Sequence, residues 1–184
     1  MIRPIPFSGD MVRAILDGRK TETRRPVKPK KHMIWEKGKP WWSVSTCPHG
    51  SPGDLLWVQE MWAIPDSEPL RGRVLPREYV AYAASCPLVD IESPSICWRP
   101  SIHMPRWACR LVLEITDVRV ERLQDITEEG ARAEGFESRA AFLFAYRAMY
   151  KLVPDANPWV WVVGFKVVAV GNDAAQAVMG DAVQ

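Results

Sequence analysis

Long apolar runs are missing from this sequence of 184 residues. No stretch approaches the roughly 20 apolar residues that a helix needs to span a bilayer. Residues 1–6 also lack the apolar core of a secretory signal. We therefore predict a cytoplasmic protein that does not enter a membrane.

Closely spaced cysteines are missing as well. The four cysteines stand far apart and form no C-x-x-C pair, at positions Cys47, Cys86, Cys97 and Cys109. This spacing predicts free thiols, with no disulfide framework and no zinc knuckle. Cys47 and His49 could supply two zinc ligands, but the others would have to come from distant residues. We predict neither a metal nor a cofactor.

A strong overall charge is the third feature that the sequence lacks, since its net charge is only +2. The distribution is uneven, however. Residues 1–50 hold 11 lysines and arginines against 4 acids, whereas residues 112–137 hold 8 acids against 3 arginines. This split is compatible with one face that binds a polyanion and another that repels it, and equally with two solvated faces.

A helix-to-strand junction lies near the N-terminus. Ser8 can cap a helix over residues 9–17, and Gly18 can end it. The apolar residues of this helix share one face and are Met11, Val12, Ile15 and Leu16. Residues 21–25 then alternate hydroxyl-bearing and charged side chains up to Pro26, which predicts a short strand. Lys20 therefore stands where a helix turns into a strand.

The rest of the chain predicts a mixed α and β protein. We expect a basic loop rich in Pro and Trp over 26–52, and a Trp/Pro-rich insertion over 61–107 that contains one strand, 78–83. The other expected elements are a turn at 51–54, a flexible tail over 171–184, and strands at 55–60, at 110–121, where apolar residues alternate, and at 159–168, which is apolar on both faces and should be central. Thr127 can cap a helix over 128–134, and Ser138 can cap a second helix whose apolar stripe is Phe142, Ala145, Tyr146 and Met149. Because no regular βαβ alternation is present, we predict an α+β fold of one domain, residues 1–170, built as a small mixed β-barrel with peripheral helices.

The sequence resembles the ASCH domain family, which shares the PUA-like pseudobarrel fold. The resemblance rests on the motif G-R-K-T-x-T-x-R at 18–25, on residues 53–58 and 133–135, and on the closing strand at 161–165, so that it covers most of residues 5–168. The tryptophan- and proline-rich segments, such as 98–107, resemble those of ASCH proteins carried by bacteriophages and prophages. One departure is Gly164, because many relatives have an acid before the aromatic residue of this strand.

The resemblance implies that the protein handles RNA or a modified nucleoside. Some small bacterial relatives are amidohydrolases that remove the acetyl group of N4-acetylcytidine. Their reactive residues fall on Lys20, Thr23 and Glu134. In that chemistry Thr23 could supply a nucleophile, Lys20 could act as a base if burial and its cationic neighbours lower its pKa, and Glu134 could orient Lys20 or protonate the amine. A solvated basic turn remains the alternative.

Binding without catalysis is equally open to this sequence. Basic side chains can track phosphates while aromatic rings stack on bases. Glu60 could point into the barrel mouth and pair with Arg24, or equally form a purely structural salt bridge. The segment around His103 and Arg106 could line the same cleft, whereas most of the nine tryptophans should belong to the core. The candidate ligand-binding residues are Arg19, Thr21, Arg24, Arg25, Trp57, Glu60, His103 and Arg106.

Four functions therefore stay open. The first is an ASCH domain that binds RNA or a modified nucleoside in a basic cleft, and the second is an amidohydrolase acting on an acylated cytidine. The others are a ribonuclease, in which the basic residues stabilise a phosphorane, and a phage accessory protein that binds a host protein through its tryptophan-rich insertion. The oligomeric state is not predicted.

Overall fold

A computed structural model describes residues 1–27, 47–64, 80–86, 96–171, 173–174 and 176–177 of the chain. These residues form two compact units. The first unit comprises Met1, Gly18–Asp54 and Glu114–Lys166, and the second comprises Ile2–Asp17, Leu55–Leu113 and Val167–Gln184. Among the described residues, no helix is long and apolar enough to cross a membrane. The prediction of a single domain over 1–170 stays a prediction.

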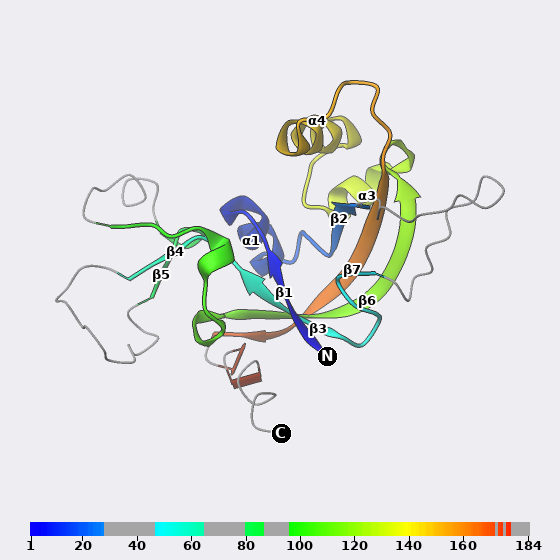
Figure 1. The fold of residues 1–184 in the computed structure, drawn as a ribbon. Helices are drawn as coiled ribbons and strands as arrows, with labels where there is room; N and C mark the ends of the chain where they lie inside the picture. Colours follow the sequence, from blue (N-terminus) through cyan, green and yellow to red (C-terminus); the bar gives the residue numbers. More distant parts are fainter. Residues whose placement is uncertain (28–46, 65–79, 87–95, 172, 175, 178–184) are drawn as a thin grey trace, which may run out of the picture. The chain divides into compact units, whose positions relative to one another are not determined.

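The main sheet is mixed (Figure 1). Its strands are β1 (Ile2–Pro6), β2 (Glu22–Pro26), β3 (Leu55–Gln59), β6 (Leu111–Arg122) and β7 (Trp159–Val170), in the order β1-β3-β6-β7-β2. β1 runs parallel to β3, whereas β2 runs antiparallel to β7. The predicted α+β class is confirmed. In this order β1 and β2 are the outer strands of the sheet.

The second unit contains the predicted first helix, α1 (Gly9–Leu16). It begins where the Ser8 side chain accepts a hydrogen bond from the backbone N–H of Met11 at 3.5 Å, as an N-cap residue does. It ends before Gly18, whose φ of 72° is a conformation that glycine adopts without steric cost. The buried residues are Val12, Ala14 and Ile15, while Leu16, which we placed on the apolar face, is exposed.

The predicted insertion over 61–107 lies partly outside the described residues. Its described part holds a small antiparallel pair, β4 (Trp62–Ala63) and β5 (Ala81–Tyr82), and two 3-10 helices, η3 (Ser101–His103) and η4 (Arg106–Ala108). The one strand predicted here is therefore present but shorter than expected. Most of the 26–52 loop and of the 171–184 tail also lies outside the described residues.

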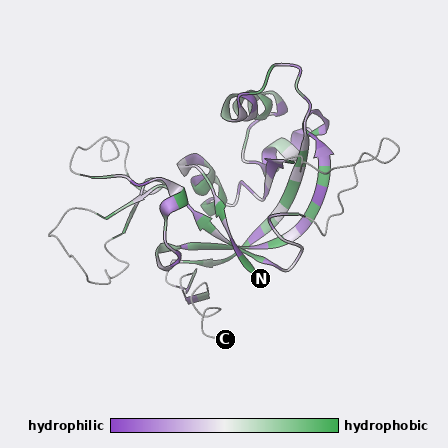
Figure 2. Cartoon of the chain, viewed as in Figure 1, coloured by the Kyte–Doolittle hydropathy of each residue, from purple (hydrophilic) through white to green (hydrophobic). Residues whose placement is uncertain are grey.

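The first unit packs two helices on β2 and β7. Thr127 caps α3 (Glu128–Ala133) and Ser138 caps α4 (Arg139–Tyr150), both as predicted. Hydrophobic and hydrophilic residues alternate around α4 (Figure 2), and its buried side consists of Phe142, Leu143 and Tyr146. Met149, which we placed in this stripe, is half exposed, because the core takes Leu143 instead.

A short 3-10 helix, η5 (Leu123–Asp125), completes the first unit. Its Leu123 joins Phe142, Tyr146 and the valines Val160 and Val162 of β7 in one buried cluster. The first half of β7 is buried on both faces, as predicted for an inner strand. This core holds the ends of β2 and α3 side by side.

Candidate functional site

The backbone at Lys20 and Thr21 is hydrogen-bonded both to the end of α3 and to β7. Its backbone forms an isolated antiparallel bridge with Glu134, the residue that ends α3. On the next residue, the N–H of Thr21 donates to the carbonyl of Ala133 at 2.7 Å, and the carbonyl of Thr21 accepts from the N–H of Phe165 at 2.8 Å. The helix-to-strand junction is therefore fixed by main-chain bonds on both sides.

The ammonium group of Lys20 is buried, and oxygen atoms of Glu22 and Glu134 accept its hydrogen bonds. Only 1% of the residue is exposed. Nζ donates to the carboxylate of Glu134, to the carbonyl of Glu22 at 2.8 Å and to the carbonyl of Glu134 at 3.1 Å. Burial lowers the pKa of Lys20, while the Glu134 carboxylate opposes that shift. Three acceptors match the three donors of the charged amine.

Arg24 is the second cation that faces Glu134. Its Nη1 lies 3.6 Å from Oε1 of Glu134 and 3.3 Å from the carboxylate of Glu22, and its Nη2 lies 3.4 Å from the carboxylate of Glu121. Gly130 in α3 makes this position possible, because a Cβ there would stand 2.9 Å from Nη2. The buried guanidinium thus joins three carboxylates from β2, β6 and the end of α3.

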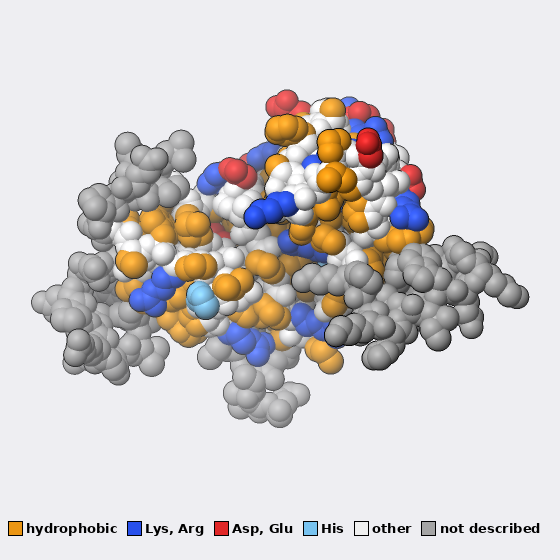
Figure 3. Space-filling model, turned by 45° about the horizontal axis from the view of Figure 1, so that its top comes forward, with side chains coloured by type: hydrophobic (Ala, Val, Ile, Leu, Met, Phe, Trp, Pro, Cys, Tyr) orange, Lys and Arg blue, Asp and Glu red, His pale blue; other side chains and the backbone are white. Residues whose placement is uncertain are grey.

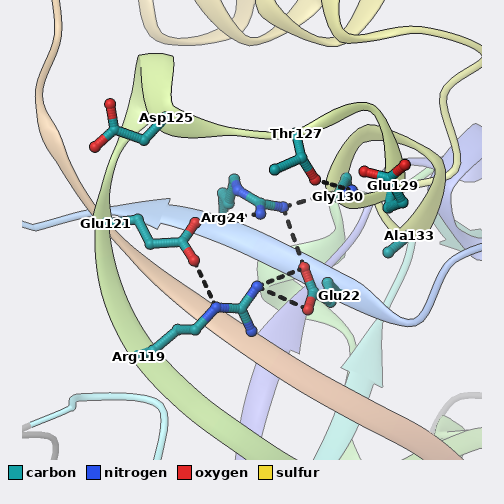
Figure 4. A pocket seen from close by; sticks show the side chains of 9 residues that line it. All are labelled: Glu22, Arg24, Arg119, Glu121, Asp125, Thr127, Glu129, Gly130 and Ala133. Carbon is teal, nitrogen blue, oxygen red and sulfur yellow. Dashed lines mark hydrogen bonds and ion pairs between the residues drawn. The ribbon is translucent and has the colours of Figure 1, made fainter.

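A pocket of ≈ 280 Å³ opens beside Arg24 (Figure 4). Arg119 crosses it from β6 and donates to Glu22 at 2.9 Å and to Glu121 at 2.6 Å. Within the described residues, no cluster of three or more His, Cys, Asp or Glu side chains could hold a metal ion. The pocket therefore offers carboxylates and guanidiniums, and its lining comprises Glu22, Arg24, Arg119, Glu121, Asp125, Thr127, Glu129, Gly130 and Ala133.

Several buried polar atoms of the first unit have incomplete hydrogen bonding. Oε1 of Glu134, Nε of Arg24 and the hydroxyl of Tyr146 have no hydrogen-bond partner among the described residues. Burial raises the pKa of Tyr146, which keeps its hydroxyl protonated as a donor. Buried polar atoms in native proteins are almost always hydrogen-bonded, so each exception calls for an explanation. These atoms are of the kind that functional sites leave incomplete.

At Lys20 and Arg24 the basic segment does not form a face separate from the acidic segment. Lys20 and Arg24 form ion pairs with Glu121 and Glu134, which belong to the acidic segment. Arg119 from that segment pairs in turn with Glu22. Opposite charges that are distant in the sequence attract once the fold brings β2, β6 and α3 together. The site is a mixed-charge pocket and not a basic cleft.

The remaining residues of the predicted motif lie around this pair. Arg19 and Thr21 are exposed, and Arg25 is half-buried. Thr23 is buried in β2, directly before Arg24. Because successive side chains of a strand point to opposite faces, Thr23 points away from the face that carries Glu22 and Arg24. The structure brings Lys20 and Glu134 together, and the catalytic roles of all three residues stay predictions.

Two candidate residues of the second unit, Trp57 and Glu60, are buried, which is the alternative that the sequence left open for each of them. Glu60 does not pair with Arg24, because both of its carboxylate oxygens accept from Arg110, at 2.7 and 2.8 Å. Trp57 is not an open stacking surface, since it is buried in a cluster with Cys109 and Val112. Trp57 lies within β3, and Glu60 follows directly after it, so both side chains belong to the core of the second unit.

His103 and Arg106 belong to the second unit, where His103 is exposed at the end of η3. Arg106 begins η4 and is half-buried, and its Nε and Nη2 have no hydrogen-bond partner. Nearby in the sequence, Trp107 packs edge-on against Trp62 with ring centroids 6.4 Å apart. The roles of His103 and Arg106 in a ligand site stay predictions.

Sequence reasoning missed Glu22, Arg119 and Glu121. A signal for two of them exists in β6, where Asp117, Arg119 and Glu121 alternate with Val118 and Val120. Such alternation places the three charged residues on one face of a strand. Nothing in the sequence indicated that Glu22 of β2 would pair with Arg119 of this face.

Gly164, where many relatives of the resembled family carry an acid, faces Glu22 across the β2–β7 ladder. A Cβ at Gly164 would stand 3.1 Å from the hydroxyl of Thr116, so a larger side chain would be crowded there. Glu22 is the register partner of Gly164, so its carboxylate is the one nearest in register to the position of the acid in those relatives.

Comparison with known proteins gives similarity at the level of structure. No protein-family model and no curated protein matches this chain. Among solved structures, an ASCH domain from Lactobacillus crispatus JV V101 matches 91% of this chain and 80% of its own, with a TM-score of 0.46 and 16% identity. A protein from Enterococcus faecalis V583 of the family DUF984 matches 92% and 83%, with a TM-score of 0.45 and 14% identity. The first carries the name of the family that the sequence motifs resemble.

Proposed function

We propose that the first unit binds one base of an RNA, or a free modified nucleoside, in the pocket beside Arg24. The observation that carries this proposal is the mixture of donors and acceptors in the lining, with Arg24 and Arg119 beside Glu22 and Glu121. Carboxylates accept from the exocyclic amine of a base, and guanidiniums donate to its ring nitrogens and carbonyls. A volume of ≈ 280 Å³ suits one small ligand.

The charge of the lining favours a base over a phosphate. Four carboxylates and two guanidiniums line the pocket, so a phosphate group entering it would meet more negative than positive charge. Within RNA, the phosphates would therefore stay outside while one unstacked base enters, as single-stranded RNA recognition allows. We expect a nucleoside to bind more tightly than its 5′-monophosphate.

Calorimetry with cytidine, N4-acetylcytidine, uridine and cytidine monophosphate tests this proposal. The Glu121→Gln variant removes one acceptor of the pocket, and Glu137→Gln, at an exposed position outside it, is the matched control. We expect a loss of about tenfold in affinity for the amine-bearing nucleoside in the first variant, since a lost hydrogen bond to a charged group costs about 1.5–3 kcal/mol, and no loss in the control. Equal affinities in both variants, or tighter binding of the monophosphate, would refute the proposal.

Deacetylation of an N4-acetylcytidine-type nucleoside is a second candidate, favoured by the lowered pKa of Lys20. The Thr23 hydroxyl would attack the acetyl carbon while Lys20 takes its proton, the amine would leave with a proton from Glu134, and water would release acetate. This route requires a neutral Lys20, whereas its three acceptors suit the charged form. It also requires the Thr23 hydroxyl at the substrate, whereas Thr23 points away from the face of β2 that lines the pocket. Binding is therefore the first proposal.

Chromatography separates the two candidates. Incubation with N4-acetylcytidine releases cytidine only if the chain hydrolyses the amide. A double variant, Lys20→Met with Glu134→Leu, removes both charges of the buried pair together and so avoids an unpaired buried charge. Cytidine release that is absent from this folded variant would support hydrolysis. Binding without release in the wild type would leave the binding function alone.

A further inference from the structure

The side of α4 away from the core forms a groove that is separate from the pocket beside Arg24. The groove has a volume of ≈ 680 Å³ and shares no lining residue with that pocket. Along α4, Ala140, Phe144 and Ala148 recur at i, i+4 and i+8, which places them in one row on the helix surface. The full lining is Arg139, Ala140, Leu143, Phe144, Arg147, Ala148, Lys151, Leu152 and Pro154.

The apolar part of the groove is exposed to an unusual degree. Phe144 is 78% exposed at the centre of its row, and an alanine stands one turn away on either side. Hydrophobic side chains gather in the upper part of Figure 3, with basic and acidic side chains beside them. Aromatic side chains at the centre of a patch with small neighbours are typical anchors of protein interfaces.

The charge of the groove has one sign only. Three lining residues are basic and none is acidic. Arg139 is already held by the carbonyls of Gln124 and Ile126, at 2.6 and 2.9 Å. Arg147 and Lys151 lie in the last turn of α4 and directly after it, and no ion pair in the described part of the chain involves either of them. These two cations are thus available to a negatively charged partner.

We propose that this groove docks an acidic amphipathic segment of a partner protein. Apolar side chains of the segment would pack on Phe144 and the alanines beside it, and its carboxylates would pair with Arg147 and Lys151. This is the helix-in-groove mode of recognition, in which apolar anchors repeat along one helix face. The alanines beside Phe144 allow a second helix to approach closely. Complementarity to Arg147 and Lys151 requires that helix to carry negative charge.

The lining favours a peptide over a single-stranded nucleic acid. Six of the nine lining residues are apolar, and Phe144 is the only aromatic residue among them. Single-stranded nucleic acids are bound by successive aromatic platforms together with a basic track along the phosphates. A groove lined mainly by aliphatic side chains instead desolvates the apolar face of a helix.

A fluorescein-labelled peptide of about 16 residues, with leucines on one helix face and glutamates on the other, is the probe. Fluorescence polarisation should show saturable binding that weakens as salt rises. Phe144→Ala and the double variant Arg147→Glu with Lys151→Glu should each weaken binding about tenfold or more. Met149→Ala, on α4 but outside the groove, and Arg132→Glu, at an exposed position of α3, are matched controls that should leave peptide binding unchanged.

Two further probes decide the nature of the occupant. One is a peptide of the same composition with scattered leucines, and the other is a labelled single-stranded RNA of similar length. Because Phe144 is exposed, its alanine variant should keep the unfolding midpoint of the wild type, which separates lost binding from lost folding. Equal binding of both peptides, full binding by Phe144→Ala, or displacement of the peptide by the RNA would each overturn the proposal.

Discussion

Both units bury a glutamate beside a cation, but they complete the pair differently. In the second unit, Glu60 receives two hydrogen bonds from Arg110, whose Nη1 also donates to Ser85 at 2.6 Å and whose guanidinium stacks on Tyr82 at 4.1 Å. In the first unit, Glu134 keeps one oxygen without a hydrogen bond. The first arrangement is saturated, and the second is not.

This difference separates a structural pair from a candidate site. A fully satisfied buried network makes a unique, rigid packing, whereas an unsatisfied one costs free energy unless something else completes it. Glu134 also faces two cations, Lys20 and Arg24, and lies beside a pocket, whereas Glu60 faces a single arginine. We therefore expect the two pairs to respond differently to substitution.

The largest effect on stability is expected from Arg110→Met. This change leaves the carboxylate of Glu60, which is 1% exposed, without any cation. Removing one partner of a buried pair costs about 3–5 kcal/mol, which urea unfolding followed by circular dichroism measures. Arg99→Met is the control, since Arg99 also stacks on an aromatic ring, Trp62, but pairs with no acid. A loss no greater than that of the control would remove the distinction between the two units.

A smaller loss of stability is expected from Lys20→Met, about 2–4 kcal/mol, because Arg24 remains 3.6 Å from Glu134. Calorimetry should also show weaker nucleoside binding, since Glu134 then draws Arg24 away from the pocket. Adding Glu134→Leu should restore most of the stability without restoring binding. If Lys20→Met proves as costly as Arg110→Met and spares binding, the second cation does not compensate.

Gly130→Ala should change stability by less than about 1 kcal/mol, because the helix propensity of alanine offsets the cost of displacing a flexible side chain. The new Cβ would stand 2.9 Å from Nη2 of Arg24 and move it, so nucleoside affinity should fall about tenfold. Gly9→Ala in α1 is the matched control, since its nearest contact is an ordinary 3.6 Å. Unchanged affinity would show that the position of Arg24 is unimportant.

The smallest effect concerns pH. Because the folded-state pKa of Lys20 is lowered from 10.5, the unfolded chain binds more protons between the folded value and 10.5. The free energy of unfolding should therefore rise with pH through this window, relative to the double variant Lys20→Met with Glu134→Leu. Thermal unfolding of both proteins over alkaline pH measures this difference. A difference that falls with rising pH would show that Glu134 outweighs burial.

Much of the local structure could be predicted because it depends on neighbours in the sequence. Ser8, Thr127 and Ser138 each cap the helix that they were predicted to cap. The alternation in β6 and the continuous apolar run of β7 also gave strands at the expected places. The family motif placed Lys20 and Glu134 in one site, although they are 114 positions apart.

The failures at the candidate site concern pairings at long range. Trp57 and Glu60 were candidates for the ligand site because their types suit it, yet Trp57 is buried in a hydrophobic cluster and Glu60 pairs with Arg110 in the second unit. A slip of one residue in a strand reverses which face a side chain takes, and a partner such as Arg110 is 50 positions away from Glu60. No local pattern carries that information.

The sequence by itself determined the helix caps, the main strands and the junction at which Lys20 stands, since capping and periodicity act over a few residues. Only the tertiary structure decided that the basic turn folds against the acidic segment, with Arg24 and Arg119 bound by carboxylates. Oppositely charged residues that are far apart in the sequence pair once folding brings them together. The packing of the hydrophobic core of β7 and α4 determines which residues meet. The pocket is therefore a product of packing, and its chemistry is that of paired charges.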